Sequence, residues 1–255
     1  MIKTDLIRAL DPVHLFQECL GHEPDHWQKQ VLRFDGRRLI LNCSRQSGKS
    51  TTTAVLALHR AMYYPNSLIL LISPSLRQSS ELFRKVADML KILDQQPKRT
   101  EDNKLSLAFS NGSRILSLPS SESTIRGFSG VDLIIEDEAS RVDDSLYYSI
   151  RPMLAVNNGV LILMSTPWGK RGHFFSEWSE GGAVWERIQI TANDCPRISP
   201  DFLAEEKASL GDWWYSQEYF CEFRDTTDQL FHYDTVMQAF DDDVEPIFRS
   251  GTYDK

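Results

Sequence analysis

The chain has 255 residues, of which 41% are hydrophobic and 25% are charged. These values are typical of a soluble globular protein with one substantial core, and no apolar run reaches the roughly 18 residues that a membrane-spanning helix needs. The formal net charge of -8 comes from residues 201–255, which carry 14 acidic and 4 basic side chains. Residues 1–200 carry 24 basic and 22 acidic side chains, so this part of the chain can still present a basic patch to nucleic acid.

The amino terminus and the cysteines indicate the compartment. The start, MIKTDLIRALDPVHLF, has acidic residues early and lacks an apolar stretch followed by a small-residue cleavage site, which argues against a secretory signal. The four cysteines are scattered, without the paired spacing of a zinc site or the density of a disulfide scaffold. We therefore expect a cytoplasmic protein with reduced thiols and no membrane partner.

Predicted helices and buried strands alternate along most of the chain. Residues 1–23 are predicted to be helical, and a short helix is expected to begin near Trp27. Continuous apolar runs bounded by turn residues suit strands that are buried on both faces of a parallel sheet. Such runs are found at residues 38–43, 68–73, 131–136 and 160–165, and the 3.6-residue spacing of crossover helices is found at about 49–63 and 75–93.

A hairpin interrupts this alternation. Asn111-Gly112 lies between two short segments that contain apolar residues, 105–110 and 113–118, and this dipeptide is the strongest short hairpin signal.

A change of pattern near Ser199 divides the chain. From there the sequence becomes helical in character, with clustered aromatic and acidic residues, and it ends in an acidic stretch. We expect a core domain at residues 1–198, a small lid subdomain at 199–240 and a solvated linker at 241–255.

The first chemical motif is LILNCSRQSGKST, residues 39–51, which comprises an apolar strand, a polar turn and the start of a helix. Backbone N–H groups at a helix N-terminus can surround phosphates, a lysine adds a mobile charge and a hydroxyl can bind Mg²⁺. Cys43 stands where the usual pattern has its first glycine, so a positive φ is not expected there. The nucleotide-binding residues predicted here are Ser44, Arg45, Gln46, Ser47, Gly48, Lys49, Ser50 and Thr51.

The second motif, VDLIIEDEA, is a buried strand that ends in adjacent acids. Asp137 is predicted to hold Mg²⁺ together with Ser50. Glu138 is predicted to accept a proton from the attacking water, the task that distinguishes hydrolases from kinases. Strand alternation points Glu136 away from Asp137, so we expect Glu136 to be a solvated or structurally paired acid.

The third motif, VLILMSTPWGKRG, places Ser165 and Thr166 at the carboxyl edge of the sheet, where ligands of α/β proteins bind. These hydroxyls either sense the γ-phosphate or only end the strand before Pro167. Together the motifs predict an α/β fold: a P-loop NTPase of the additional-strand, catalytic-glutamate class, with a mostly parallel central sheet flanked by helices and a small C-terminal helical lid.

The motifs SRQSGKS, IIEDEA and MSTPWGKRGHFF, in this order, resemble those of tailed-phage terminase large subunits, over about Trp27 to Phe231. The resemblance implies that Gln28 contacts adenine, that Arg45 lies near the phosphates and that Thr166 belongs to a coupling motif. It also implies that Arg126, in TIRGFSG, is an arginine finger that acts on a neighbouring subunit. Arg45 is the competing candidate for that role.

The same resemblance implies an activity and partners. ATP hydrolysis with Mg²⁺ would power the movement of double-stranded DNA into a viral procapsid in the host cytoplasm. The implied partners are DNA, a portal, a small terminase subunit and further copies in a ring, expected to be a pentamer, with a monomer in isolation left open. The clustered acids of a terminase nuclease domain are not seen after Phe231, so we expect an isolated motor domain.

Two alternatives remain open from the sequence. A helicase-like translocase of superfamily 2 shares the glutamine motif, the GKS loop and the acidic strand, but it needs a second RecA-like domain of about 150 residues. A nucleotide-binding switch without turnover would not need Glu138. If DNA is bound, the candidate phosphate contacts are Arg84, Lys85, Lys91, Lys98 and Arg99, which acidic neighbours nearly balance.

Overall fold

The computed structural model describes residues 2–94, 96–120, 125, 127–225 and 233–239. Residues 1–224 form one compact unit and residues 225–255 a second, which contains the short helix α10 (Tyr233–Met237). None of the helices in the described ranges is long and apolar enough to cross a membrane.

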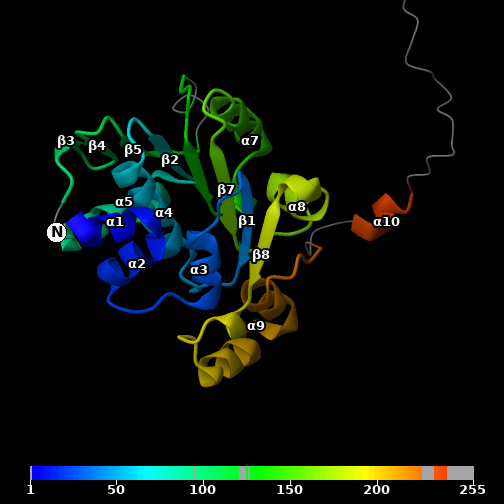
Figure 1. Cartoon of the computed structure of the whole chain (residues 1–255). Coiled ribbons are helices and arrows are strands. Elements are labelled where there is room, and N and C mark those ends of the chain that lie inside the picture. Colours follow the sequence, from blue (N-terminus) through cyan, green and yellow to red (C-terminus); the bar gives the residue numbers. More distant parts are fainter. Residues whose placement is uncertain (1, 95, 121–124, 126, 226–232, 240–255) are drawn as a thin grey trace, which may run out of the picture. The chain divides into compact units, whose positions relative to one another are not determined.

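An eight-stranded sheet forms the centre of the first unit, in the order β3-β4-β5-β2-β6-β7-β1-β8 (Figure 1). The five strands from β2 to β8 in this order are parallel to their neighbours, and β5 is parallel to β2. The strands are β1 (Arg38–Cys43), β2 (Leu68–Ser73), β3 (Arg99–Asp102), β4 (Ser106–Phe109), β5 (Arg114–Pro119), β6 (Leu133–Asp137), β7 (Val160–Ser165) and β8 (Glu186–Ile190).

The predicted additional-strand class is confirmed by the position of β7. It lies between β1, which leads into the phosphate loop, and β6, which carries the paired acids. The predicted hairpin is also confirmed, because β4 and β5 pair antiparallel around Asn111-Gly112.

The ends of the predicted 131–136 strand were wrong. β6 begins two residues later. The Val131 N–H donates to the Met153 carbonyl, outside the sheet, whereas Asp132 already bonds to both neighbouring strands, donating to the Leu68 carbonyl and accepting the Val160 N–H.

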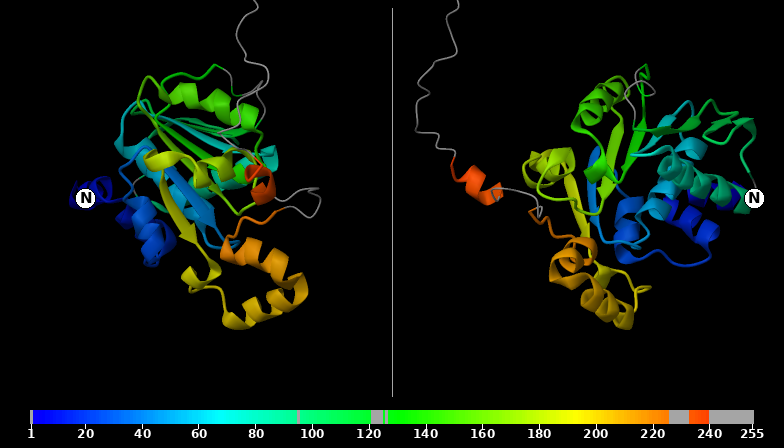
Figure 2. Two further views of the ribbon diagram at one scale, coloured as in Figure 1. Left: turned by 90° about the vertical axis from the view of Figure 1, so that its right-hand side faces the viewer. Right: turned by 180° about the vertical axis from the view of Figure 1, so that it is seen from behind.

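Helices cover both faces of the sheet (Figure 2). Leu39 and Leu41 point to the face covered by α2 to α5, whereas Ile40 points to the face covered by α7 and α8. This two-sided burial is why the parallel strands are continuously apolar. The helices of this unit are α1 (Ile2–Leu10), α2 (Pro12–Leu20), α3 (His26–Leu32), α4 (Lys49–Tyr63), α5 (Leu76–Ile92), α7 (Asp144–Ile150), α8 (Gly172–Ser179) and α9 (Pro200–Phe220).

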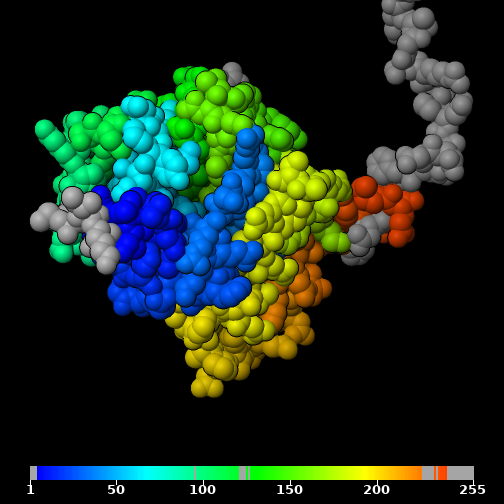
Figure 3. Space-filling view, viewed as in Figure 1, coloured from blue at the N-terminus to red at the C-terminus, as the bar shows by residue number. Residues whose placement is uncertain are grey.

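The helix α9 carries the aromatic cluster that follows Ser199. The Ser199 side chain accepts the N–H of Phe202, which caps the helix, and Gly211 kinks it with φ 74° and ψ 164°. The yellow surface of the chain leading into α9 borders the blue surface of α3 (Figure 3). There Arg197 Nη2 lies 2.7 Å from Asp25 Oδ2, so an ion pair joins the segment before α9 to the start of α3.

Candidate nucleotide-binding site

The phosphate loop connects the end of β1 to the start of α4. Cys43 is still part of β1, and the left-handed conformations fall instead at Gln46 (φ 59°) and Gly48 (φ 97°). The loop therefore does not need a glycine at position 43, which explains why a strict sequence pattern fails there. Gly48 is the residue for which the left-handed conformation costs least.

Neighbouring segments hold this loop open around its N–H groups. The Ser44 N–H donates to the Ile190 carbonyl at 2.7 Å, and the Arg45 N–H donates to the Glu218 carbonyl at 3.0 Å. Arg197 Nη2 donates to the Ser47 carbonyl at 3.2 Å. Within the described part of the chain, the N–H groups of residues 46–50 have no backbone partner. Unpaired N–H groups at a helix N-terminus fit a phosphate chain.

The loop meets the two acids at the end of β6. Ser50 Oγ donates to Asp137 Oδ2 at 3.1 Å, and Lys49 Nζ lies 3.0 Å from Glu138 Oε1. These contacts join the hydroxyl and the carboxylate that are predicted to hold Mg²⁺. They also join the lysine that is predicted to bind phosphate and the glutamate that is predicted to accept a proton from the attacking water. The residues present therefore fit a nucleotide with its magnesium ion.

Glu138 reaches Lys49 because the chain turns there. The residue is left-handed (φ 56°, ψ 40°), and its N–H donates to Asp137 Oδ1 at 3.0 Å. A non-glycine residue in this region is uncommon and costs of order 1–3 kcal/mol, and such positions cluster at active sites. The turn frees Glu138 from strand alternation, so both of the adjacent acids face the phosphate loop.

Burial and charge act together on the ionisable groups of the site. Burial raises the pKa of Asp137, and the Glu138 charge raises it further against the effect of Lys49. Burial alone would lower the pKa of Lys49, but the charges of Glu138 and Asp137 outweigh it and hold the pKa above the ordinary value. The ammonium is therefore kept charged in a largely buried position.

Two predicted ligands, Gln28 and Arg45, are engaged by protein groups. Gln28 Nε2 donates to Thr52 Oγ1 at 3.1 Å, and its Oε1 accepts the Asp25 N–H at 2.8 Å. Arg45 pairs with the Glu218 carboxylate of α9 and points toward that helix. The adenine role of Gln28 and the phosphate role of Arg45 stay predictions.

Thr166 directly follows β7, the neighbour of the acidic strand β6, and its role in a coupling motif stays a prediction. It is buried, and its carbonyl accepts the Ser140 hydroxyl at 2.9 Å. The same hydroxyl lies 2.7 Å from Ser165 Oγ. Ser140 thus connects the turn after Glu138 to the end of β7. Arg126, the predicted arginine finger, lies outside the described residues.

The candidate DNA contacts on α5 and β3 have nearby partners. Lys85 Nζ donates to Thr51 Oγ1 at 3.0 Å, which places it at the first turn of α4. No local sequence pattern connects this lysine with the phosphate loop, because Lys85 and Thr51 are 34 positions apart. Three further candidates pair with acids three residues away: Arg84 with Glu81, Lys91 with Asp88 and Arg99 with Asp102.

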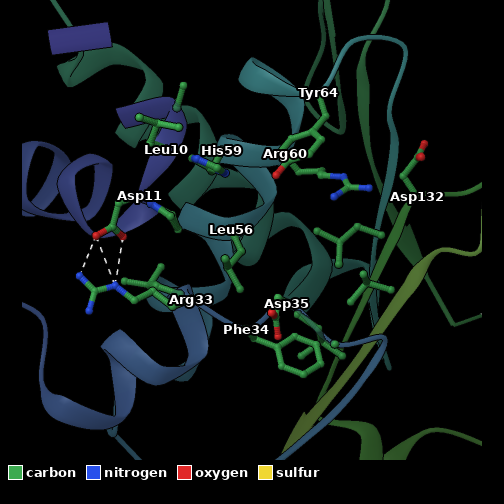
Figure 4. Close-up of a pocket in the computed structure, with 17 residues that line it drawn as sticks. Leu10, Asp11, Arg33, Phe34, Asp35, Leu56, His59, Arg60, Tyr64 and Asp132 are labelled. Carbon is green, nitrogen blue, oxygen red and sulfur yellow. Dashed lines mark hydrogen bonds and ion pairs between the residues drawn. The ribbon is translucent and has the colours of Figure 1, made fainter. Parts of the chain in front are cut away.

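A cavity of about 540 Å³ lies at the opposite end of the parallel strands (Figure 4). Its lining includes Arg60 and Tyr64, near the end of α4, and Asp132, before β6. Arg60 lies 11 residue steps after Lys49, which is about 16 Å along the helix. The cavity is therefore separate from the phosphate loop, and it contains none of the predicted nucleotide ligands.

Comparisons with known proteins point to one family. Residues 40–237 match the family model described as terminase large subunit, T4likevirus-type, N-terminal. The terminase large subunit of Thermus phage G20c is 28% identical over 239 residues, which cover 86% of this chain and 49% of that protein. The chain thus spans about half the length of the curated relatives it matches.

Solved structures show the same fold. The ATPase domain of the large terminase of Thermus phage P74-26 superposes with a TM-score of 0.73 and 24% identity, covering 84% of this chain and 99% of that one. The large terminase of a thermophilic bacteriophage, in complex with ATP-gamma-S, gives a TM-score of 0.64 and 14% identity, covering 78% of this chain and 52% of that one.

Proposed function

The chain belongs to the family of terminase large subunits of the T4-like type, and we propose that it hydrolyses ATP with Mg²⁺ to move double-stranded DNA into a viral procapsid. One observation carries the chemical part of this proposal. Lys49 Nζ of the phosphate loop lies 3.0 Å from Oε1 of Glu138, just after β6, and Ser50 Oγ lies 3.1 Å from Oδ2 of Asp137, at the end of β6. Family membership carries the DNA part and favours a terminase over a helicase of superfamily 2.

Each residue of this cluster has a distinct task. The N–H groups of residues 46–50 and the Lys49 ammonium bind the β- and γ-phosphates. Ser50 and Asp137 hold Mg²⁺, which neutralises the charge that develops during phosphoryl transfer. The Glu138 carboxylate orients the attacking water and accepts its proton. In the structure Lys49 neutralises Glu138, so a γ-phosphate competes for the same ammonium and releases the carboxylate toward the water.

The proposed nucleotide is ATP. A relative of the same fold is described as a complex with ATP-gamma-S, which supports this assignment. Both ends of the Gln28 amide are hydrogen-bonded to protein groups. In the proposed complex Gln28 therefore exchanges one of these two bonds for a hydrogen bond to adenine.

The proposed arginine finger is Arg126 of a neighbouring subunit. The pairing of Arg45 with Glu218 supports this choice, because Arg45 has to leave that carboxylate before it can reach a phosphate of its own subunit. A finger supplied in trans makes hydrolysis depend on assembly into a ring, which we propose to be a pentamer.

We further propose the division into a core at 1–198, a lid at 199–240 and a linker at 241–255. The contacts of Glu218 with the backbone and the side chain of Arg45 support a lid that senses the phosphate loop. We also propose that the chain works with a portal and a small terminase subunit, in the host cytoplasm.

Phosphate release with and without double-stranded DNA tests the motor function. A DNA-driven motor hydrolyses ATP several-fold faster with duplexes of unrelated sequence, and the stimulation falls with salt because the contacts are to phosphates. The Lys49→Ala variant controls for contaminating ATPases, and Lys29→Ala, the same change at an ion pair outside the loop, controls for loss of a lysine. Hydrolysis that duplex DNA leaves unchanged at every salt concentration contradicts the proposal.

A further inference from the structure

An ion cluster, buried at Glu136 and His173 and exposed at Asp144, lies on the face of β6 that turns away from the nucleotide. Glu136, the acid before Asp137, is fully buried, and its Oε1 lies 3.0 Å from Nε2 of His173. The other ring nitrogen, Nδ1, lies 3.1 Å from Asp144 Oδ1. The same carboxylate oxygen also accepts the backbone N–H of His173 at 2.6 Å. The expectation that Glu136 is a structurally paired acid is confirmed.

Counting protons defines the charge of His173. A neutral imidazole has one N–H donor, but here each ring nitrogen faces a carboxylate oxygen, which can only accept when ionised. Both contacts are satisfied together when His173 is an imidazolium. Burial alone would lower the pKa of His173, but the hydrogen bonds and charges of Glu136 and Asp144 outweigh it and raise the pKa.

The imidazolium joins three elements. Glu136 lies on β6, Asp144 begins α7, and His173 lies in the first turn of α8, which follows the loop after Thr166. The ring stacks on Tyr147 of α7 with centroids 4.4 Å apart and an interplanar angle of 8°. Tyr147 in turn donates to Glu177 of α8 at 2.6 Å. These are the charged and titratable groups that face the ring among the described residues.

We propose that His173 is a positioning residue for ATP hydrolysis, which holds the catalytic end of β6 in place through Glu136. The proposal rests on the proposed ATPase function. His173 does not touch the reacting groups. It acts because Glu136 immediately precedes Asp137 and Glu138, so a shift of the Glu136 side chain moves both acids relative to Lys49 and Ser50.

The connection also extends to the coupling motif. Ser140 already ties the turn after Glu138 to Ser165 and Thr166, on the side of the nucleotide. His173 ties the same strand to the helix that follows that motif, from the opposite face. A change at the γ-phosphate that moves β6 therefore reaches α8 along two routes.

A pair of substitutions tests this role. His173→Gln leaves the buried Glu136 carboxylate without a cation, and we expect kcat to fall at least about tenfold while ATP binding changes less than about threefold. Adding Glu136→Gln removes the buried charge and restores a neutral hydrogen-bonded pair, so the double variant should recover at least about threefold of the lost kcat. His22→Gln, at an exposed histidine, is the matched control.

All variants are assayed well below their unfolding midpoints, so that loss of folded protein does not enter kcat. A folded His173→Gln protein with kcat within twofold of wild type overturns the positioning role, as does a double variant no faster than the single one. Absence of turnover in the wild type itself overturns the proposed function, and this role with it, so the two failures are distinguishable.

A second readout does not depend on turnover. The imidazole ¹⁵N shifts of wild-type His173 should show both nitrogens protonated to a pH above the ordinary histidine range, because Glu136 and Asp144 raise the pKa of the ring. In Glu136→Gln one carboxylate is gone, so the second proton should be lost at a lower pH than in wild type. A wild-type ring that loses its second proton at no higher pH than in Glu136→Gln overturns the ion cluster.

Discussion

Replacing Glu138 by glutamine should separate ATP binding from hydrolysis. Glutamine keeps the volume and the Oε1 atom that faces Lys49 at 3.0 Å, but it cannot accept a proton from water. Loss of a general base costs roughly 10² to 10⁴ in rate, or about 2.7–5.4 kcal/mol of transition-state stabilisation. The loop N–H groups and Ser50 are unchanged, so ATP should bind at least as tightly as to wild type.

Lys49→Ala should fail in the opposite way. A charge-assisted hydrogen bond is worth about 1.5–3 kcal/mol, so its loss weakens ATP binding by about 10- to 150-fold. The effect should lie at the upper end, because Glu138 is then left to repel the γ-phosphate.

Equilibrium binding of ATP and quenched-flow phosphate release on the same samples measure both quantities. Glu81→Gln, the same chemical change on the exposed side of α5, should behave as wild type. Turnover of Glu138→Gln within tenfold of wild type would refute its assignment as the base, and loss of ATP binding in that variant would show a structural role instead.

Four further outcomes are expected. Leu41→Ala, in a fully buried position of β1, should lower the free energy of unfolding by about 2–5 kcal/mol in denaturant titrations, and a loss below about 1 kcal/mol would show that the core collapses around it. A mixture of Arg126→Ala and Glu138→Gln subunits should regain hydrolysis that neither variant has alone, because an intact active site of one subunit can meet an intact arginine finger of another. Mixtures that stay inactive under assembling conditions would favour Arg45 as the arginine finger. The ring of Trp214 lies 6.2 Å from that of Trp168, beside the Arg45–Glu218 pair. The fluorescence of Trp214 should therefore differ between the ATP-analogue and ADP states, and identical spectra would argue against a moving lid. The His173 ion pairs should stabilise the fold fully below pH 6.5 and progressively less as the pH rises through the raised pKa, a slope that His173→Gln should abolish.

The buried parallel strands could be predicted well from the sequence. The ends of β1, β2 and β7 match because both faces of each strand are buried, which leaves an unbroken apolar run between polar turns. β8 was not predicted. It is an edge strand of the sheet, and Glu186 and Gln189 are exposed on its two opposite faces, so its apolar pattern is weak.

The phosphate loop and the paired acids were predictable because each lies within one short segment. The partners of these segments were not, because they depend on tertiary proximity. Glu218 meets Arg45 across 173 positions, and His173 meets Glu136 across 37. Strand alternation predicted that Glu136 points away from the nucleotide, but no local signal names the histidine that it meets.

Mg²⁺-dependent phosphate release from ATP tests the central claim most directly. Wild-type protein, assayed over a range of concentrations with duplex DNA present, should release phosphate only with Mg²⁺, and its specific activity should rise with concentration as neighbouring subunits supply the finger. Substitution of Asp137 by asparagine should abolish the release, because the carboxylate that holds Mg²⁺ beside Ser50 is lost. Release that persists in Asp137→Asn, or that is absent from wild type at every concentration, would contradict the account.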